Sequence, residues 1–365
     1  MTRATQTSLL AQQIADAVKG RDRVQVMEVC GTHTVSIFRN GIRSLLPPNV
    51  RLISGPGCPV CVTAQRHIDA AIELASRAGL TVATYGDMIR VPGRVDSLET
   101  LRARGADIRV VNSARTALQL AQRNVSRQVV FLGVGFETTA PATAATILEA
   151  EQLGINNFSV LASHKLVVPA MMALLDDGDV PLDGFLCPGH VSVIIGVRAY
   201  EPIAARYGKA CVIAGFEAQA ILVGLLRLMQ LVGQGRASVE NAYAGIVRED
   251  GNPAARRLME RVFVTCDAPW RALGVIPASG LELAPAYERF DAAKRFDIVI
   301  GEDCDPPGCR CGEVIQGKVE PLECGLFGSD CTPVHPVGPC MVSSEGTCAA
   351  WFKYHWPSMR QEGRT

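Results

Sequence analysis

The sequence predicts an α/β protein with two βα (parallel-sheet) domains, followed by a cysteine-rich C-terminal domain. Three observations lead to this fold class. Between residues 24 and 214, short apolar runs alternate with segments of helical periodicity, as in βαβ units. From residue 302 onward, glycine, proline and cysteine dominate and the periodicity ends. Seven of the 13 cysteines lie in this last part, whose apolar surface is too small for a packed core without an inorganic centre.

The expected elements follow from the periodicity, taken in chain order. An N-terminal helix is predicted because Leu9, Leu10, Ile14 and Val18 recur at helical spacing, a pattern unlike that of a signal peptide. Eight apolar runs are predicted to be strands: Val24–Val29, Arg51–Ser54, Thr81–Tyr85, Ile108–Val111, Gln128–Val134, Phe158–Leu161, Gly184–Leu186 and Ala210–Ile213. Later helices are predicted at Ala64–Ala78, Ala114–Arg123, Ala142–Leu153 and Ala218–Val232. We expect domains at 1–124, 125–235 and 236–365, because the run at Gln128 starts a new βα series.

The charge balance excludes several classes of protein. Lys plus Arg and Asp plus Glu each number 36, so the formal net charge is zero. A nucleic-acid-binding domain or a polybasic membrane-surface protein would carry a basic excess. The apolar runs are far shorter than the roughly 20 residues that span a bilayer. We therefore expect a cytoplasmic protein with no nucleic-acid or membrane partner, in which clustered cysteines indicate metal or redox chemistry.

Two cysteine motifs follow the first two predicted strands. Cys30 begins the sequence CGTHT, and Cys58 and Cys61 belong to GPGCPVC. Loops at the carboxyl ends of parallel strands meet in one crevice, so these loops are expected to face each other. A helix starting near Thr63 would place both CPVC thiols at its N-terminus, which favours thiolate. The CxxC pair can cycle between dithiol and disulfide, and Cys30 can complete a soft metal site.

His33 in the CGTHT motif has several interpretations. As a fourth ligand it would complete a Cys₃His set, which is typical of structural zinc. It could also be a general acid, a residue that supports the ligands, or a hydrogen-bonding partner inside the loop. The residues alone leave these alternatives open.

Two further motifs follow later strands. The segment GFETTAPAT, beginning at Gly135, opens a helix whose N-terminus suits an anion or a partner's carboxylate. It lacks the lysine of a P-loop and the third glycine of a dinucleotide fingerprint, so we expect a docking face with Glu137 as a partner contact, and no nucleotide site. The motif CPGH, from Cys187 to His190, repeats the Cys-x-x-His spacing of Cys30 and His33.

The C-terminal cysteines form the last pattern. Four thiolates on Gly- and Pro-rich turns can wrap a cubane cluster, whereas a zinc ribbon would present paired CxxC knuckles. The expected ligands are Cys309, Cys324, Cys331 and Cys348. Cys311 and Cys340 are possible substitutes or a nearby dithiol. The chemistry of this segment therefore favours an iron–sulfur domain.

These motifs together resemble the HypD-type hydrogenase maturation factors over nearly the whole chain. The matching stretches are Cys30–Thr34, Gly55–Cys61, Gly135–Ala144, Cys187–Val191 and Cys331–Trp351. One departure is visible: the family usually carries proline three residues after the CPVC motif, where this chain has Ala64.

The resemblance implies an accessory protein that helps to build the Fe(CN)2CO group of [NiFe]-hydrogenases. By motif position, Cys30, Cys58 and Cys61 would hold Fe(II) carrying cyanide and CO. The ligands of a [4Fe-4S] cluster would be Cys309, Cys324, Cys331 and Cys348. The implied partners are a small HypC-type chaperone, a HypE-type cyanide donor supplied by HypF from carbamoyl phosphate, and indirectly the hydrogenase large subunit.

Two other functions compete with this one. An iron–sulfur-dependent thiol–disulfide oxidoreductase would use the Cys58–Cys61 pair and would not need Cys30. A zinc-stabilised binding protein would be colourless. A metallocentre-assembly scaffold with redox activity agrees with the motifs better than a turnover enzyme does.

Overall fold

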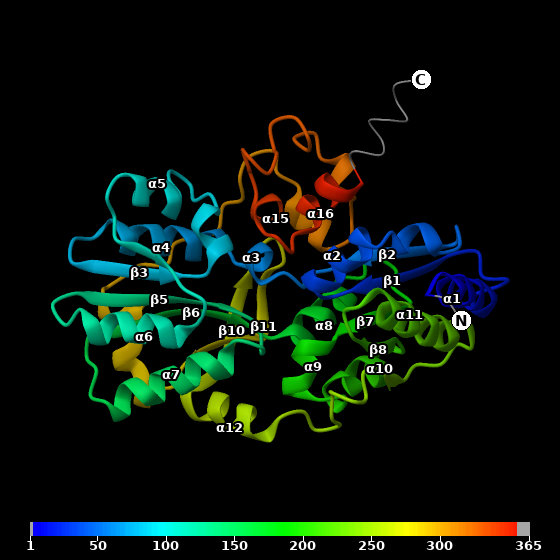
Figure 1. Cartoon of the computed structure of the whole chain (residues 1–365), viewed down its shortest axis with the longest axis horizontal. Helices are drawn as coiled ribbons and strands as arrows, with labels where there is room; N and C mark the ends of the chain where they lie inside the picture. The colour runs from blue at the N-terminus through cyan, green and yellow to red at the C-terminus, as the bar shows by residue number, and fades with distance from the viewer. Residues whose placement is uncertain (1–2, 356–365) are drawn as a thin grey trace.

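Two β-sheets lie side by side in the computed structural model, which describes residues 3–355 (Figure 1). The first sheet has five parallel strands in the order β2 (Val50–Ser54), β1 (Val24–Glu28), β7 (Gly184–Pro188), β8 (Ala210–Ala214) and β9 (Val239–Asn241). The second has six strands in the order β10 (Phe263–Trp270), β11 (Gly274–Leu283), β6 (Phe158–Lys165), β5 (Gln128–Gly135), β3 (Leu80–Thr84) and β4 (Ile108–Val110). All eight strands predicted from apolar runs are confirmed, with ends shifted by at most a few residues.

Helices cover both faces of each sheet, which explains the continuous apolar runs of the inner strands. Every residue of β1, β3 and β8 is buried. The first sheet packs between α1 (Arg3–Ala17) and α11 (Ala218–Gly233) on one face and α8 (Val167–Asp177), α9 (Gly189–Ile195) and α10 (Glu201–Tyr207) on the other. The second sheet packs between α4 (Gln65–Ser76), α5 (Leu98–Ala103) and α13 (Ala292–Arg295) on one face and α6 (Ala114–Arg123) and α7 (Ala140–Gln152) on the other.

The sheets do not follow the chain order that we expected. Residues 1–124 contribute β1 and β2 to the first sheet but β3 and β4 to the second, and residues 125–235 are divided in the same way. The expected divisions at 124 and 235 therefore do not separate the sheets. The physical reason is that a βα unit specifies only local pairing, so a chain can leave one sheet and return to it later.

The second sheet also contains an antiparallel hairpin that the sequence analysis did not predict. Strands β10 and β11 pair with each other, and β11 pairs with β6. They come from the range 236–365, part of which thus belongs to the second sheet. The helix α12 (Pro253–Val262) leads into this hairpin.

The cysteine-rich C-terminal segment packs over the ends of both sheets, beside two short N-terminal helices (Figure 1). Its helices are α14 (Cys311–Ile315), α15 (Pro339–Val342) and α16 (Thr347–Tyr354). The N-terminal helices that they contact are α2 (Gly31–Arg39) and α3 (Pro59–Val62). Among residues 3–355, no helix combines the length and the apolar character needed to cross a bilayer.

Candidate functional site

The strand order brings three motif loops together. Strand β1 lies between β2 and β7. The next strand in the chain, β2, is on one side of β1, and the later strands β7 and β8 extend the sheet on the other side. Such a switch opens a crevice at the carboxyl ends of the strands. The loop of Cys30 therefore lies between the loop of Cys58 and the loop of His190, as expected for the two cysteine motifs.

Cys30 is buried at the start of α2 and is 1% exposed. Its Sγ lies 3.7 Å from Nε2 of His190, at the start of α9. The backbone of Gly57 passes against Cys30 so closely that a Cβ at Gly57 would fall 2.1 Å from the Cys30 nitrogen. The glycine in the GPGCPVC motif thus allows the CPVC loop to contact the CGTHT loop.

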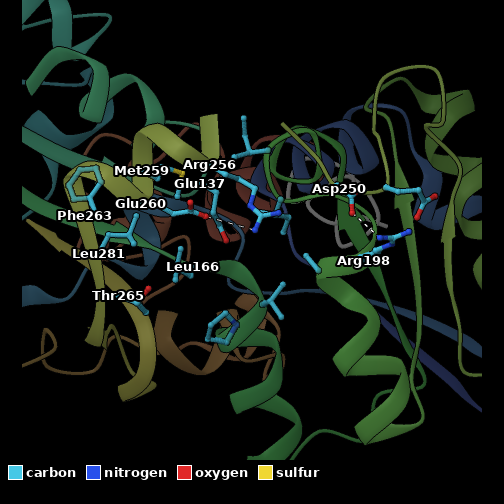
Figure 2. Close-up of a pocket in the computed structure, with 16 residues that line it drawn as sticks. Glu137, Leu166, Arg198, Asp250, Arg256, Met259, Glu260, Phe263, Thr265 and Leu281 are labelled. Carbon is cyan, nitrogen blue, oxygen red and sulfur yellow. Dashed lines mark hydrogen bonds and ion pairs between the residues drawn. The ribbon is translucent and has the colours of Figure 1, made fainter. Parts of the chain in front are cut away.

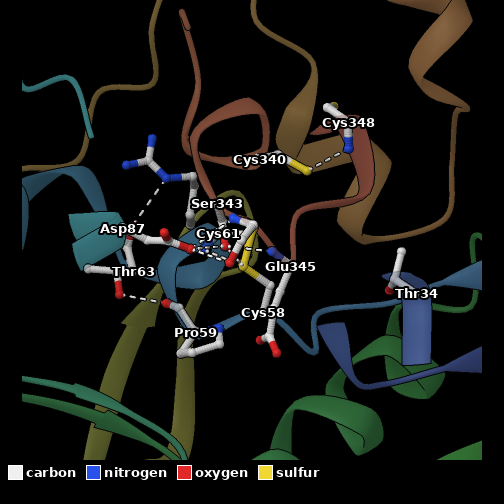
Figure 3. Close-up of a disulfide and its surroundings, with 12 residues drawn as sticks. Thr34, Cys58, Pro59, Cys61, Thr63, Asp87, Cys340, Ser343, Glu345 and Cys348 are labelled. Atoms are coloured by element: carbon white, nitrogen blue, oxygen red, sulfur yellow. Dashed lines mark hydrogen bonds between the residues drawn. A yellow bond between two sulfur atoms is a disulfide. The ribbon is translucent and has the colours of Figure 1, made fainter. Parts of the chain in front are cut away.

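Cys58 and Cys61 form a disulfide with a Cα–Cα distance of 5.3 Å (Figure 3). Cys58 caps the short helix α3, and both residues are buried. The helix predicted at Ala64–Ala78 is present as α4 (Gln65–Ser76). The two cysteines do not lie at its N-terminus, because they belong to the separate helix α3 and the chain is extended at Thr63 and Ala64. The structure thus joins the two cysteines of the CxxC motif, while their cycling between dithiol and disulfide stays a prediction.

The C-terminal segment contacts the disulfide and the CGTHT loop through two polar residues. The Oγ of Ser343 lies 3.3 Å from the Sγ of Cys58 and also contacts Asp87. The hydroxyl of Thr32 donates to Glu345 at 2.6 Å. Figure 3 shows Ser343 and Glu345 beside the Cys58–Cys61 bond. Ser343 and Glu345 thus link the cysteine-rich segment to both N-terminal motifs.

The surroundings of Cys30 favour the neutral thiol. Burial raises the pKa of Cys30 well above its usual range. Burial also raises the pKa of Glu28 to about 7, and this carboxyl accepts hydrogen bonds from the Cys30 nitrogen and the Thr34 hydroxyl. Burial lowers the pKa of His190, so its imidazole is neutral near pH 7 and its Nε2 can accept a hydrogen bond from the Cys30 thiol.

His33 is fully buried on the other side of the motif. Its Nε2 lies 2.9 Å from the carbonyl of Gly215, to which it donates. Burial lowers its pKa to about 4. Its Nδ1 has no hydrogen-bond partner within the described part of the chain. His33 therefore hydrogen-bonds the loop that follows β8 and not, as one interpretation had it, its own loop.

Three residues of this site were not predicted as site residues: His190, Ser343 and Glu345. The signal for His190 was the recurrence of Cys-x-x-His in the motif CPGH, which follows a strand as CGTHT does. No spacing in the sequence connects Ser343 and Glu345 with a loop that lies 285 residues away.

All four predicted cluster ligands line one small apolar cavity. Its walls include Leu326, Phe327 and Met341, and its thiols are those of Cys309, Cys311, Cys324, Cys331 and Cys348. A hydrogen bond from Cys311 lowers the pKa of Cys309 to about 7. The Sγ of Cys340 accepts a hydrogen bond from the Cys348 nitrogen at 3.2 Å. Cys304 is exposed and does not line this cavity.

These thiols do not form a site for a single metal ion. Within residues 3–355, no three His, Cys, Asp or Glu side chains converge on one point as ion ligands do. A cubane differs, because each thiolate binds a separate iron and the four sulfurs surround the cluster. The buried thiols of Cys331 and Cys348, the partly buried thiols of Cys309 and Cys324, and the apolar walls fit that group by the chemistry of the donor set.

Glu137 does not lie where the motif analysis expected it. Its side chain is 3% exposed, so it is not a surface contact for a partner. Its Oε1 accepts a hydrogen bond from the Val167 nitrogen at 3.0 Å, which caps the first turn of α8. The apolar run before α8 buries this turn, and the carboxyl supplies the partner that the backbone N–H needs.

Comparisons with known proteins agree with this arrangement. The family model HypD, described as the hydrogenase formation hypA family, matches residues 5–355. The hydrogenase maturation factor HypD of Escherichia coli (strain K12) is 46% identical over 332 residues, covering 91% of this chain and 89% of that protein. The protein of the same name from Azotobacter vinelandii is 47% identical over 353 residues, covering 94% and 93%. The one from Cupriavidus necator is 46% identical over 357 residues, covering 94% of each chain. The chain therefore belongs to the HypD family of hydrogenase maturation factors.

Proposed function

We propose that this protein is the scaffold and electron donor on which the Fe(CN)2CO group of [NiFe]-hydrogenases is assembled. One observation carries the proposal. The buried thiol of Cys30 lies 3.7 Å from Nε2 of His190, and the backbone of Cys30 contacts the loop that carries the Cys58–Cys61 disulfide. A scaffold needs such a set of soft donors in a closed site, since thiolate suits a low-spin iron with cyanide and CO.

In this proposal, iron is the cargo, and Cys30, Cys58 and Cys61 hold it only after the disulfide is reduced, because the three sulfurs do not converge as ion ligands while Cys58 and Cys61 are joined. The disulfide must first take up two electrons and two protons to become two thiols. The thiols then lose protons as iron binds, because the thiolate is the metal ligand. His190 is placed to accept the proton of Cys30, and Glu28 lies next to the Cys30 backbone.

The resident cofactor of the proposal is a [4Fe-4S] cluster held by four cysteines: Cys309, Cys324, Cys331 and Cys348. When bound, it would supply electrons singly from an external reductant. Cys311 and Cys340 are buried beside these residues: Cys311 hydrogen-bonds Cys309, and Cys340 hydrogen-bonds Cys348. Ser343, two residues beyond Met341 of the cavity wall, contacts Cys58, so the cysteine-rich segment and the disulfide are in direct contact.

The partners of the proposal follow from the family. A small HypC-type chaperone would share the iron, a HypE-type protein would deliver cyanide, and the hydrogenase large subunit would receive the product indirectly. We place this assembly in the cytoplasm. The protein acts as a scaffold with redox activity and not as a turnover enzyme.

The disulfide favours a second candidate, a thiol–disulfide oxidoreductase that uses Cys58 and Cys61. Complementation of a strain that lacks its own HypD distinguishes the two. Cys30→Ala should abolish hydrogenase activity, whereas Cys304→Ala, which changes an exposed cysteine, should retain it. Full activity of the Cys30→Ala variant would favour the oxidoreductase and contradict the scaffold.

A further inference from the structure

A pocket of about 490 Å³ lies apart from both cysteine sites, between α8, α9 and α12 (Figure 2). Its walls are mostly apolar and include Leu166, Ile194, Ile195, Met259 and Phe263. Pockets of this size and character are typical small-molecule sites when a few polar groups point into them. The walls come from both halves of the fold, since α9 packs on the first sheet and Phe263 begins a strand of the second.

The end of α9 and the loop at 249–252 are in close backbone contact in this wall of the pocket. Gly196 follows α9 with a φ of +88°, and a Cβ there would fall 2.3 Å from the carbonyl oxygen of Glu249. The nitrogen of Arg198 donates to the same carbonyl at 3.2 Å, and that of Asn252 donates to Ile194 at 3.0 Å. The loop at 249–252 is therefore fixed against the end of α9, and the pocket has a defined shape.

Glu137 supplies a buried polar group to this pocket. Its side chain is 97% buried, and its Oε1 is occupied by the Val167 nitrogen. Its Oε2 has no hydrogen-bond partner among the described residues. A buried polar atom without a partner costs about 1–3 kcal/mol. A ligand that donates a hydrogen bond to this oxygen would remove that cost.

The charged residues that line the pocket determine whether it favours a positively or a negatively charged ligand. Both arginines are already paired: Arg198 with Asp250 at 3.0 Å and Arg256 with Glu260 at 3.9 Å. The remaining charged groups of the lining are Glu249 and, above its raised pKa of about 7, Glu137. The pocket thus carries an acidic excess, which favours a cation over an anion.

We propose that this pocket binds a small organic cation whose amine or amidine donates to Oε2 of Glu137 while its apolar body contacts the walls formed by Met259 and Phe263. This site is separate from iron assembly and is not part of the proposed function. The ligand is a free small molecule, because a volume of about 490 Å³ matches the body of a small organic compound.

The test uses benzamidine as the probe, titrated by calorimetry or NMR into the full-length, anaerobically purified protein. We expect one molecule to bind with a millimolar or lower Kd, and benzoate, which has the same shape and the opposite charge, to bind at least tenfold more weakly. Glu137→Gln should weaken benzamidine binding at least tenfold. Asp176→Asn, at the far end of α8, is the matched control and should leave it unchanged.

A second variant keeps the test decisive if Glu137→Gln does not fold. Met259→Trp fills the pocket from α12 and should abolish binding, while the cluster absorption of the protein persists. The proposal is overturned if benzamidine does not bind below 10 mM, if benzoate binds equally well, or if Met259→Trp leaves the affinity unchanged.

Discussion

Cys30 and His190 are separated by 160 positions in the chain, yet the Sγ of one lies 3.7 Å from the Nε2 of the other. The cause is the neighbouring position of β1 and β7, each of which ends in a Cys- or His-bearing loop at the same edge of the sheet. The ring of His190 is stacked on Phe216 with a centroid distance of 4.8 Å, which fixes its orientation. The imidazole of His190 is thus held beside the thiol of Cys30.

We predict that His190→Phe lowers iron retention at the Cys30 site by tenfold or more. The substitution keeps an aromatic ring on Phe216 but removes the nitrogen next to the thiol. Loss of a group that supports a metal ligand typically costs 10- to 100-fold in affinity. Metal analysis of reduced protein checks this, and His190→Gln should restore part of the retention. Equal iron content in the His190→Phe variant and the unchanged protein would show that the imidazole has no such role.

Ser343→Ala should make the Cys58–Cys61 disulfide harder to reduce. The Ser343 hydroxyl donates to Asp87, so its oxygen can accept a hydrogen bond from the S–H of reduced Cys58, which the disulfide cannot donate. Loss of about 1 kcal/mol corresponds to a potential more negative by roughly 20 mV. Redox titration with thiol labelling measures this potential. Ser344→Ala is the matched control, since its hydroxyl hydrogen-bonds Asp87 at 2.8 Å.

The cluster prediction concerns the cysteine cavity. Anaerobic protein should be brown and contain about four irons, and Cys324→Ala or Cys331→Ala should remove the visible absorption. Cys304→Ala should retain it, because this cysteine is exposed and outside the cavity. If Cys309→Ala keeps the cluster and Cys311→Ala destroys it, the first ligand is Cys311 and our assignment is wrong.

The buried Glu137 carboxyl predicts a pH dependence of stability. Burial raises its pKa from 4.5 to about 7, so the folded state holds the proton between these pH values while the unfolded state has lost it. The free energy of unfolding therefore falls as pH rises from about 4.5 to 7, by roughly 3 kcal/mol from this group.

Glu137→Gln should remove this dependence, so that the variant gains stability relative to the unchanged protein as pH rises. Denaturant unfolding at pH 5 and pH 8 measures the difference. An equal difference in stability at both pH values would show that the carboxyl titrates normally.

The sequence predicted the inner strands well because both faces of these strands are buried. The five residues of β8 (Ala210–Ala214) are all buried and all apolar, so the apolar run there is continuous. Strand β10 could not be predicted in this way, because Val264 and Thr265 are exposed and its neighbours do not alternate regularly. Its place in the second sheet depends on pairing with β11, which local patterns do not specify.

Part of the site was also predictable from the sequence. Cys30 and Cys58 each follow a parallel strand, so their proximity followed from topology alone. The order of β1 next to β7 was not readable from the chain, and the proximity of His190 was missed with it. The contacts of Ser343 and Glu345 arise only when the C-terminal segment packs on α2 and α3.

The central claim is that Cys30 holds the iron on which cyanide and CO are assembled. Infrared spectroscopy of anaerobic protein, purified together with its HypC-type partner, tests it most directly, because cyanide and CO stretches have no protein background. We predict these bands in the unchanged protein and their loss in Cys30→Ala, whose cluster absorption persists. Undiminished cyanide and CO bands in Cys30→Ala would contradict the account.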